Sequence, residues 1–242
     1  MGLQRKRESI KNYKIIRGVF DERTLLVLYK LLNRTGVVVE SLVKEGKESV
    51  ILSGLNKEKE WVALKVYRTE ACDFKNMWKY LVGDPRFFKL KKSRRSIVNT
   101  WCRREFKNLK IAYESKVRCP KPIDFEENIL MMSFIGEDGI PAPRLIDIEI
   151  ENLEEVYKDV LKNLERMVKN GLVHGDLSAY NILFFEKAYF IDFSHGTTVD
   201  NPIAPELLKR DIKNLNLYFS KSGVEVKDED EIYERLKKLA GF

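Results

Sequence analysis

Two aspartates and an asparagine in the second half of the chain have the types and spacing that phosphoryl transfer requires. Asp176 lies in the run His-Gly-Asp-Leu-Ser, Asn181 follows it by five residues and Asp192 by sixteen. In such a reaction one carboxylate orients the incoming hydroxyl and accepts its proton, while a second carboxylate and an amide oxygen hold Mg2+ on the phosphates. We therefore predict that Asp176 is the catalytic base and that Asn181 and Asp192 bind Mg2+, or Mn2+ in its place.

The separation of these residues is that of a known catalytic loop, H-R-D-x-x-x-x-N of protein kinases. Asp and Asn are also ordinary turn residues, because their side chains bond nearby backbone groups. Turn chemistry alone does not require the second motif, and apolar residues flank both motifs, at 172–173, 182–185 and 189–191. This pattern predicts a hairpin that brings both carboxylates to one end.

A lysine far upstream supplies the cation. The run Val-Ala-Leu-Lys ending at Lys65 matches the strand motif V-A-I-K, whose lysine reaches the α- and β-phosphates. Its expected partner is a glutamate on a helix, for which Glu105 is the first candidate and Glu114 the second. The forty residues between Lys65 and Glu105 predict an insertion, a mobile basic loop over 70–99 in which 73–80 could be helical.

The remaining pattern predicts the frame. Asp21 should cap a helix that runs toward residue 34, strands should cover 37–43, 49–55, 61–67 and 129–135, and helices should cover 153–169, 205–219 and 230–239. We expect residues 1–34 to form a helical extension, 35–135 one lobe and 136–242 a second lobe. The strand at 129–135 would lead into a hinge, where backbone groups of Ser133 and Ile135 could bond an adenine edge.

Composition limits the class of protein. The chain has 242 residues, 44% hydrophobic and 33% charged, which is typical of a soluble globular protein. No apolar run suits a membrane span or a signal peptide, so we expect a cytoplasmic protein with no membrane partner. Three cysteines without metal spacing and only two histidines argue against a zinc site, and any metal should be bound by oxygen.

The net charge of +7 is concentrated in one stretch. Residues 89–95 contain five Lys or Arg side chains and no acid. The stretch could be a solvated surface loop, or it could bind RNA or another polyanion.

With these motifs in order, the sequence resembles the RIO family of atypical serine/threonine protein kinases, most closely its type-one subfamily in an archaeal-like minimal form. The resemblance covers roughly residues 21–223. It is carried by Gly46-Lys47-Glu48-Ser49, Val66-Tyr67-Arg68-Thr69, Thr100-Trp101, Pro141-Ala142-Pro143-Arg144-Leu145, the run from His174 to Ser178, and Lys209-Arg210-Asp211-Ile212.

The resemblance implies an α+β, two-lobed protein-kinase-like fold, with an antiparallel sheet and a helix in the N-lobe, a mainly helical C-lobe and no activation segment. It implies ATP as the substrate, Mg2+ as the metal, and precursor small ribosomal subunits, with their rRNA and proteins, as partners of a monomer or weak oligomer. Asp176, Asp192 and Lys65 would be catalytic, and Asp192 would also be a possible phosphate acceptor. The expected ATP-binding residues are Gly46, Lys47, Ser49, Lys65, Glu105, Met132, Ser133, Phe134 and Ile135. Candidate autophosphorylation sites are Ser93 and Ser96.

The sequence departs from the family at three positions: Glu45 replaces a usual threonine, Ser133 a hinge glutamate and His195 a glutamine. The Ala-Pro-Glu run at 204–206 spells a motif that closes activation segments in ordinary kinases, but only twelve positions separate it from Asp192.

Two other functions remain open. An aminoglycoside-type small-molecule phosphotransferase uses a similar His-Gly-Asp loop, although the fifty residues after Asp192 leave little room for its substrate subdomain. The chain could also be a non-catalytic, nucleotide-binding ribosome assembly factor.

Overall fold

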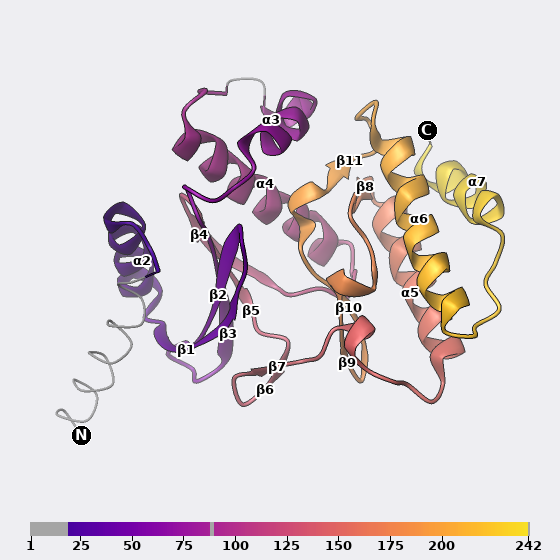
Figure 1. Ribbon diagram of the computed structural model, residues 1–242, viewed down its shortest axis with the longest axis horizontal. Helices are drawn as coiled ribbons and strands as arrows, with labels where there is room; N and C mark the ends of the chain where they lie inside the picture. The colour runs from indigo at the N-terminus through magenta and orange to yellow at the C-terminus, as the bar shows by residue number, and fades with distance from the viewer. Residues whose placement is uncertain (1–18, 88–89, 242) are drawn as a thin grey trace.

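The computed structural model describes residues 19–87 and 90–241. A sheet flanked by helices forms one lobe, and a mainly helical second lobe lies beside it (Figure 1). The α+β, two-lobed architecture expected from the sequence is therefore confirmed. Most of the expected N-terminal extension, residues 1–18, and the basic residue Lys89 lie outside the described residues.

The N-lobe sheet is antiparallel throughout and has the strand order β1-β2-β3-β5-β4. Its strands are β1 (Val38–Glu45), β2 (Ser49–Leu55), β3 (Trp61–Tyr67), β4 (Pro122–Glu126) and β5 (Ile129–Ser133). The bounds of β2 and β3 agree with the prediction, whereas β1 extends further and β5 ends sooner than expected.

The two faces of β3 have different tasks, because side chains alternate along a strand. Leu64 and its like-facing neighbours pack against α2 (Glu22–Thr35), whose N-cap is the predicted Asp21. Lys65 and Tyr67 lie on the opposite face, where both contact a glutamate of α4 (Arg94–Glu114). One face of the strand thus builds the core and the other builds the site.

The C-lobe carries its loops on three helices, α5 (Leu153–Lys169), α6 (Ala204–Lys221) and α7 (Glu229–Ala240). The bounds of α5 are those predicted, and α6 and α7 agree to within one or two residues at each end. Short strands and 3-10 turns fill the space toward the N-lobe: β6 (Gly136–Glu137), β7 (Ile140–Pro141), η2 (Leu145–Asp147), β8 (Leu172–Val173), η3 (Ala179–Asn181), β9 (Ile182–Phe185), β10 (Lys187–Phe190), η4 (Phe193–His195) and β11 (Thr197–Thr198). β9 and β10 form the predicted hairpin between the two acidic motifs.

The expectation of a loop over 70–99 is wrong for most of that segment. It contains α3 (Phe74–Val82) and η1 (Pro85–Phe87), and α4 already begins at Arg94. The helix over 73–80, considered from the sequence, is present because Asp73 caps it and Met77 and Leu81 bury an apolar stripe against α4.

No activation segment separates the Asp192 motif from α6. η4 and β11 follow Asp192 directly, β11 pairs with β8, and the Ala-Pro-Glu run forms the first turn of α6. The fold prediction is confirmed on this point. Among the described helices, none combines the length and apolar character needed to cross a membrane.

Candidate active site

A cavity of about 640 Å³ lies between the lobes and gathers the residues predicted to bind ATP. Its lining includes all nine of them: Gly46, Lys47, Ser49, Lys65, Glu105, Met132, Ser133, Phe134 and Ile135. Asn181 and Asp192 also line it, whereas Asp176 does not. Its size is that of a typical small-molecule pocket.

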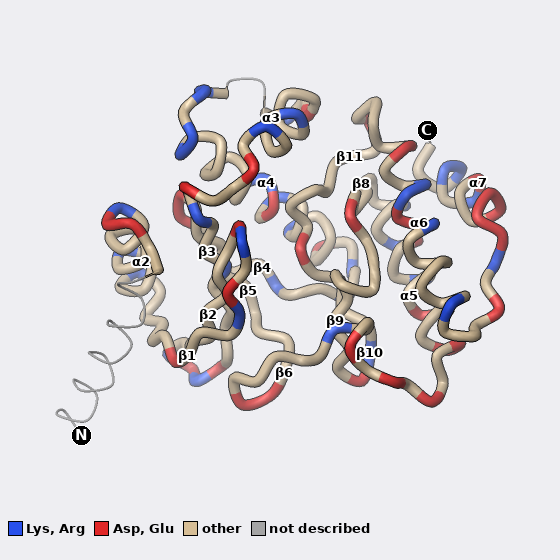
Figure 2. Tube along the Cα trace, viewed as in Figure 1, with Lys and Arg blue, Asp and Glu red and all other residues tan. Residues whose placement is uncertain are grey.

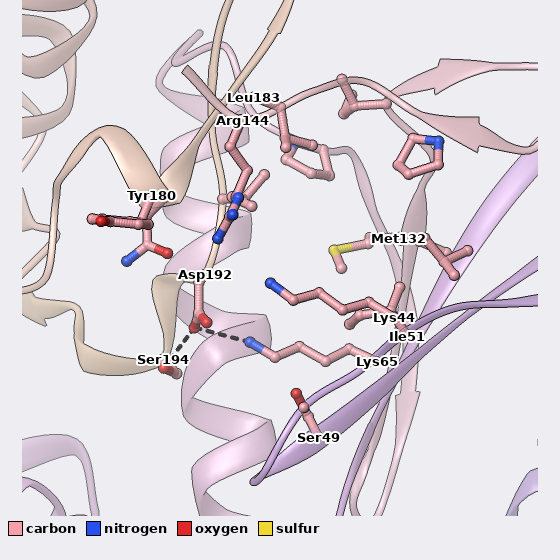
Figure 3. Close-up of a pocket in the computed structure, with 18 of the residues that line it drawn as sticks. Lys44, Ser49, Ile51, Lys65, Met132, Arg144, Tyr180, Leu183, Asp192 and Ser194 are labelled. Atoms are coloured by element: carbon pink, nitrogen blue, oxygen red, sulfur yellow. Dashed lines mark hydrogen bonds and ion pairs between the residues drawn. The ribbon is translucent and has the colours of Figure 1, made fainter. Parts of the chain in front are cut away.

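Lys65 is the centre of charge in this cavity. Its ammonium lies 2.9 Å from Asp192 Oδ1 (Figure 3) and 2.8 Å from Glu105 Oε1, so it bridges the loop after β10 and α4. Tyr67 donates its hydroxyl to the other oxygen of Glu105. The second candidate partner, Glu114, lies at the end of α4 and contacts Lys110 instead.

The bridge favours the charged form of both Lys65 and Asp192. Burial disfavours the charged form of Lys65, yet the charges of Asp192 and Glu105 outweigh it and raise the lysine pKa. Burial likewise opposes ionisation of Asp192, but Lys65 and the Ser194 hydroxyl hold the pKa of that carboxyl below its usual range. Asp192 is therefore an anion at neutral pH and can accept a cation.

The donor set fits Mg2+. Asp192 offers a carboxylate, and Asn181 offers an amide oxygen, because its Nδ2 already donates to Asp176. Within the described ranges no three His, Cys, Asp or Glu side chains form a metal cluster. Mg2+ needs no such cage, since it is usually held by one or two carboxylates together with substrate phosphates. The backbone of Asp192 has φ 62°, a left-handed conformation that is uncommon for a residue other than glycine.

The catalytic loop holds Asp176 next to Asn181, whose Nδ2 lies 3.0 Å from the Asp176 carboxylate. Burial raises the pKa of Asp176 above its ordinary value, and the nearby Asp192 charge adds to this rise against the effect of His195. A raised pKa suits a proton acceptor, because a general base works best when its pKa approaches the operating pH.

Two residues of α6 anchor this loop, and the sequence pattern alone gave them no role. Asp211, fully buried, accepts from the N–H groups of Gly175 and Leu177 at 2.8 and 2.7 Å, and Arg210 donates to the Gly175 carbonyl. Their Lys-Arg-Asp-Ile run enters the sequence analysis only through the family resemblance. The available signal was an acid at a position that the helical pattern predicts to be buried.

The end of the cavity where we expect adenine lies beside β5. The N–H of Ser133 donates to the Lys121 carbonyl and that of Phe134 to the Trp61 carbonyl, so neither is free for a base. Among the described residues, none accepts from the Ile135 N–H. Of these three N–H groups, that of Ile135 is left to donate to an adenine edge, and the contacts of adenine with backbone groups of Ser133 and Ile135 stay a prediction.

Lys44 is a further cation in the cavity, beside Lys47 and Lys65, and sequence reasoning missed it. It pairs across the sheet with Ile51, which in turn pairs with Lys65. Cross-strand partners share a face, and Figure 3 shows the two lysines extending in parallel toward Asp192. The strand register would have revealed Lys44, had the β1–β2 pairing been known.

The two candidate phosphorylation sites do not line the cavity. Ser93 is exposed and caps α4 by accepting from the Ser96 N–H at 3.3 Å. Ser96 lies in the first turn of the helix, and its carbonyl accepts from Thr100.

Comparisons with known proteins identify the family of this chain. The family model of the RIO domain matches residues 50–232. The RIO-type serine/threonine-protein kinase Rio1 of Methanocaldococcus jannaschii is 40% identical over 94% of this chain and 79% of its own length. The Thermoplasma acidophilum protein of the same name is 44% identical over 74% of this chain and 95% of its own. The human serine/threonine-protein kinase RIO1 is 34% identical, but the match spans only 40% of that protein.

Among solved structures, the Rio2 kinase–ADP/Mg2+–phosphoaspartate complex from Chaetomium thermophilum has a TM-score of 0.69. The match covers 89% of this chain and 66% of the Rio2 chain at 23% identity, so it bears on the fold alone. The family follows from the RIO-domain match and the Rio1 relatives. The two-lobed fold and the lysine between two carboxylates are consistent with these matches. The matches show that the chain belongs to the RIO family of atypical serine/threonine-protein kinases.

Proposed function

We propose that this chain is a Mg2+-dependent, ATP-using serine/threonine kinase or ATPase that acts in maturation of the small ribosomal subunit. The observation that carries the chemical part is the bridge from Glu105 through Lys65 to Asp192 at the floor of the cavity. An ammonium held between two carboxylates is positioned to take up phosphate oxygens in place of one of them.

ATP would lie with its adenine between Met132 and Ile135 and its phosphates toward Lys65 and the β1–β2 turn. Gly46, Lys47 and Ser49 belong to that turn, which the Gly46 N–H closes by donating to the Ser49 carbonyl at 2.9 Å. Bound Mg2+ would neutralise phosphate charge. Asn181 and Asp192 would hold the metal, and Asp176 would orient the acceptor hydroxyl and take its proton.

Asp192 is also a candidate phosphate acceptor. A carboxylate oxygen of Asp192 would attack the γ-phosphorus as the bond to the ADP oxygen breaks, and water would then hydrolyse the acyl phosphate. The anionic state of Asp192 supports this step. An acyl phosphate should be stable in acid and cleaved by hydroxylamine, whereas a phosphoserine at Ser93 or Ser96 would resist hydroxylamine.

The ribosomal role rests on family membership and on the basic stretch 89–95, which leads from η1 into the first turn of α4. Arg95 of this stretch is not free, because it lies 2.7 Å from Asp21. Lys91, Lys92 and Arg94 are exposed and have no carboxylate partner among the described residues. Such cations suit a phosphate backbone.

The deciding experiment is ATP turnover with Asp176→Asn and Asp192→Asn, with and without a precursor small subunit. We expect losses of about 100-fold or more, because each change removes a charged group at the reacting atoms. Asp200→Asn is the matched control, because this aspartate is exposed and lies outside the cavity. Wild-type turnover in both test variants would contradict the site assignment, and turnover with aminoglycosides would favour the small-molecule reaction.

A further inference from the structure

A buried charged cluster lies behind the loop that follows Asp192, outside the ATP cavity. Its members are Asp84 and Arg86, at η1, and Arg104 and Asn108, on α4. Asp84, Arg104 and Asn108 are each at most 1% exposed. Buried ion pairs add little stability compared with apolar packing. We therefore asked which part of the backbone this cluster positions.

The α4 members bond the backbone of the loop at four successive residues. Asn108 Nδ2 donates to the Phe193 and Gly196 carbonyls at 2.9 and 2.7 Å. Arg104 donates to the Ser194 and His195 carbonyls at 3.2 and 3.4 Å. Every carbonyl from residue 193 to residue 196 is therefore fixed by one helix, the same helix that carries Glu105.

The backbone at Gly196 packs closely against α4. A Cβ at this residue would lie 2.9 Å from Asn108 Nδ2 and 3.1 Å from the Phe193 carbonyl. The left-handed backbone of Asp192 is strained, and such conformations persist only where the surroundings over-determine them. The four bonds after Asp192 provide that constraint.

Asp84 and Arg86 orient the two side chains that donate to the loop, Arg104 and Asn108. Arg86 Nη1 donates to Asn108 Oδ1 at 2.8 Å, which leaves Nδ2 facing the loop carbonyls. Asp84 accepts from Arg104 Nε at 3.2 Å and from Arg86 Nη2 at 2.6 Å. Burial lowers the pKa of Arg104 to about 10, so it stays charged at neutral pH and needs this counter-charge.

We propose that Asp84 and Arg86 are positioning residues for Asp192, acting through Arg104 and Asn108. The insertion between β3 and α4 then helps to position the metal site, although none of its described residues lines the cavity. The link to metal binding rests on the proposed function; the link to loop order does not.

The test compares Arg86→Gln with wild type in the full chain. Arg86→Gln removes the charge, and its shorter side chain does not reach Asn108, but it leaves Asp84 paired with Arg104. The fold should therefore persist, as the melting temperature will show. We expect faster hydrogen exchange at amides 193–197 and an Mg2+ concentration for half-maximal ADP binding raised about 10-fold. ADP affinity without metal should not change, because Arg86 lies outside the cavity. Arg86→Lys should recover part of both effects.

Arg103→Gln is the matched control. Arg103 lies on α4 and over the same Phe87 ring as Arg86, at 5.5 and 5.6 Å, but bonds no member of the cluster. It should behave as wild type in every measurement. Wild-type exchange at 193–197 in folded Arg86→Gln would overturn the inference. If Mg2+ fails to strengthen ADP binding even in wild type, the proposed function is contradicted, and hydrogen exchange alone decides the inference.

Discussion

The pH dependence of stability can test the role of Asp84 in the cluster behind the loop that follows Asp192, which we call the metal loop. Burial opposes its ionisation, but bonds from Arg86 and Arg104 hold its pKa below the ordinary value. A carboxyl with a lowered folded pKa contributes stability above its unfolded pKa, near 3.9, and that stability is lost as pH falls through the folded value. At neutral pH, removing the charge leaves Arg104 buried without its partner.

We therefore expect Asp84→Asn to lower the free energy of unfolding at pH 7 by about 3–5 kcal/mol. The difference from wild type should shrink as pH falls below about 4, because the wild-type carboxyl is then protonated as well. Urea unfolding at several pH values measures both effects. A difference that stays constant down to pH 2 would show that Asp84 does not act through its charge.

At the scale of elements, the site depends on the close contact between two loops. One is the catalytic loop, which carries Asp176, and the other is the metal loop, which follows Asp192. Gly175 has φ 76°, and a Cβ there would lie 2.7 Å from the His195 carbonyl. We expect Gly175→Ala to push the two loops apart and lower kcat by about 10- to 100-fold, since small misplacements in an active site have effects of this size. Steady-state kinetics on the folded variant tests this.

Gly223→Ala separates contact from backbone strain. Gly223 has φ 86° and no atom within 4 Å of the added Cβ. Both variants should lose about 1–2 kcal/mol of stability from the left-handed backbone, but only Gly175→Ala should lose activity. Equal kcat values in the two variants would mean that the loops do not depend on this contact.

Local patterns explain which elements could be predicted. The bounds of β2, β3 and α5 follow from the sequence, because alternation, helical spacing and a terminating Gly171 act over a few residues. The motif residues Lys65, Asp176 and Asn181 carry signatures of their own. Lys44 and Asn108 lie in no such motif. The position of Lys44 in the cavity depends on strand register, and the role of Asn108 depends on contacts with residues more than 80 positions away. The prediction of a loop over 70–99 included a helix at 73–80 but missed η1 and the start of α4 at Arg94, because basic residues precede the first buried apolar residues of that helix, Ile97 and Val98.

At the scale of the whole molecule, the net charge of +7 is less informative than its distribution. Figure 2 shows cations along α3 and at the start of α4, and acids and bases mixed over the C-lobe helices. Lys92 and Arg94 lie over the α3 rings Trp78 and Phe74 at 5.8 and 4.7 Å, which orients them on the surface. The insertion between β3 and α4 also carries Asp84 and Arg86. A polyanion bound to its cations would therefore lie on the segment that we propose positions the metal loop.

We expect replacement of Lys91, Lys92 and Arg94 by glutamine to weaken binding to a small-subunit precursor rRNA fragment and to reduce the salt dependence of that binding. Each lost phosphate contact should lower the slope of log K against log salt by about 0.7–0.9. The matched control replaces three exposed α5 lysines, Lys158, Lys162 and Lys169, and removes the same total charge. A filter-binding titration from low to high salt measures both triples. Equal losses would show that only overall charge matters, and wild-type binding by the first triple would remove the basic stretch from the proposed RNA contact.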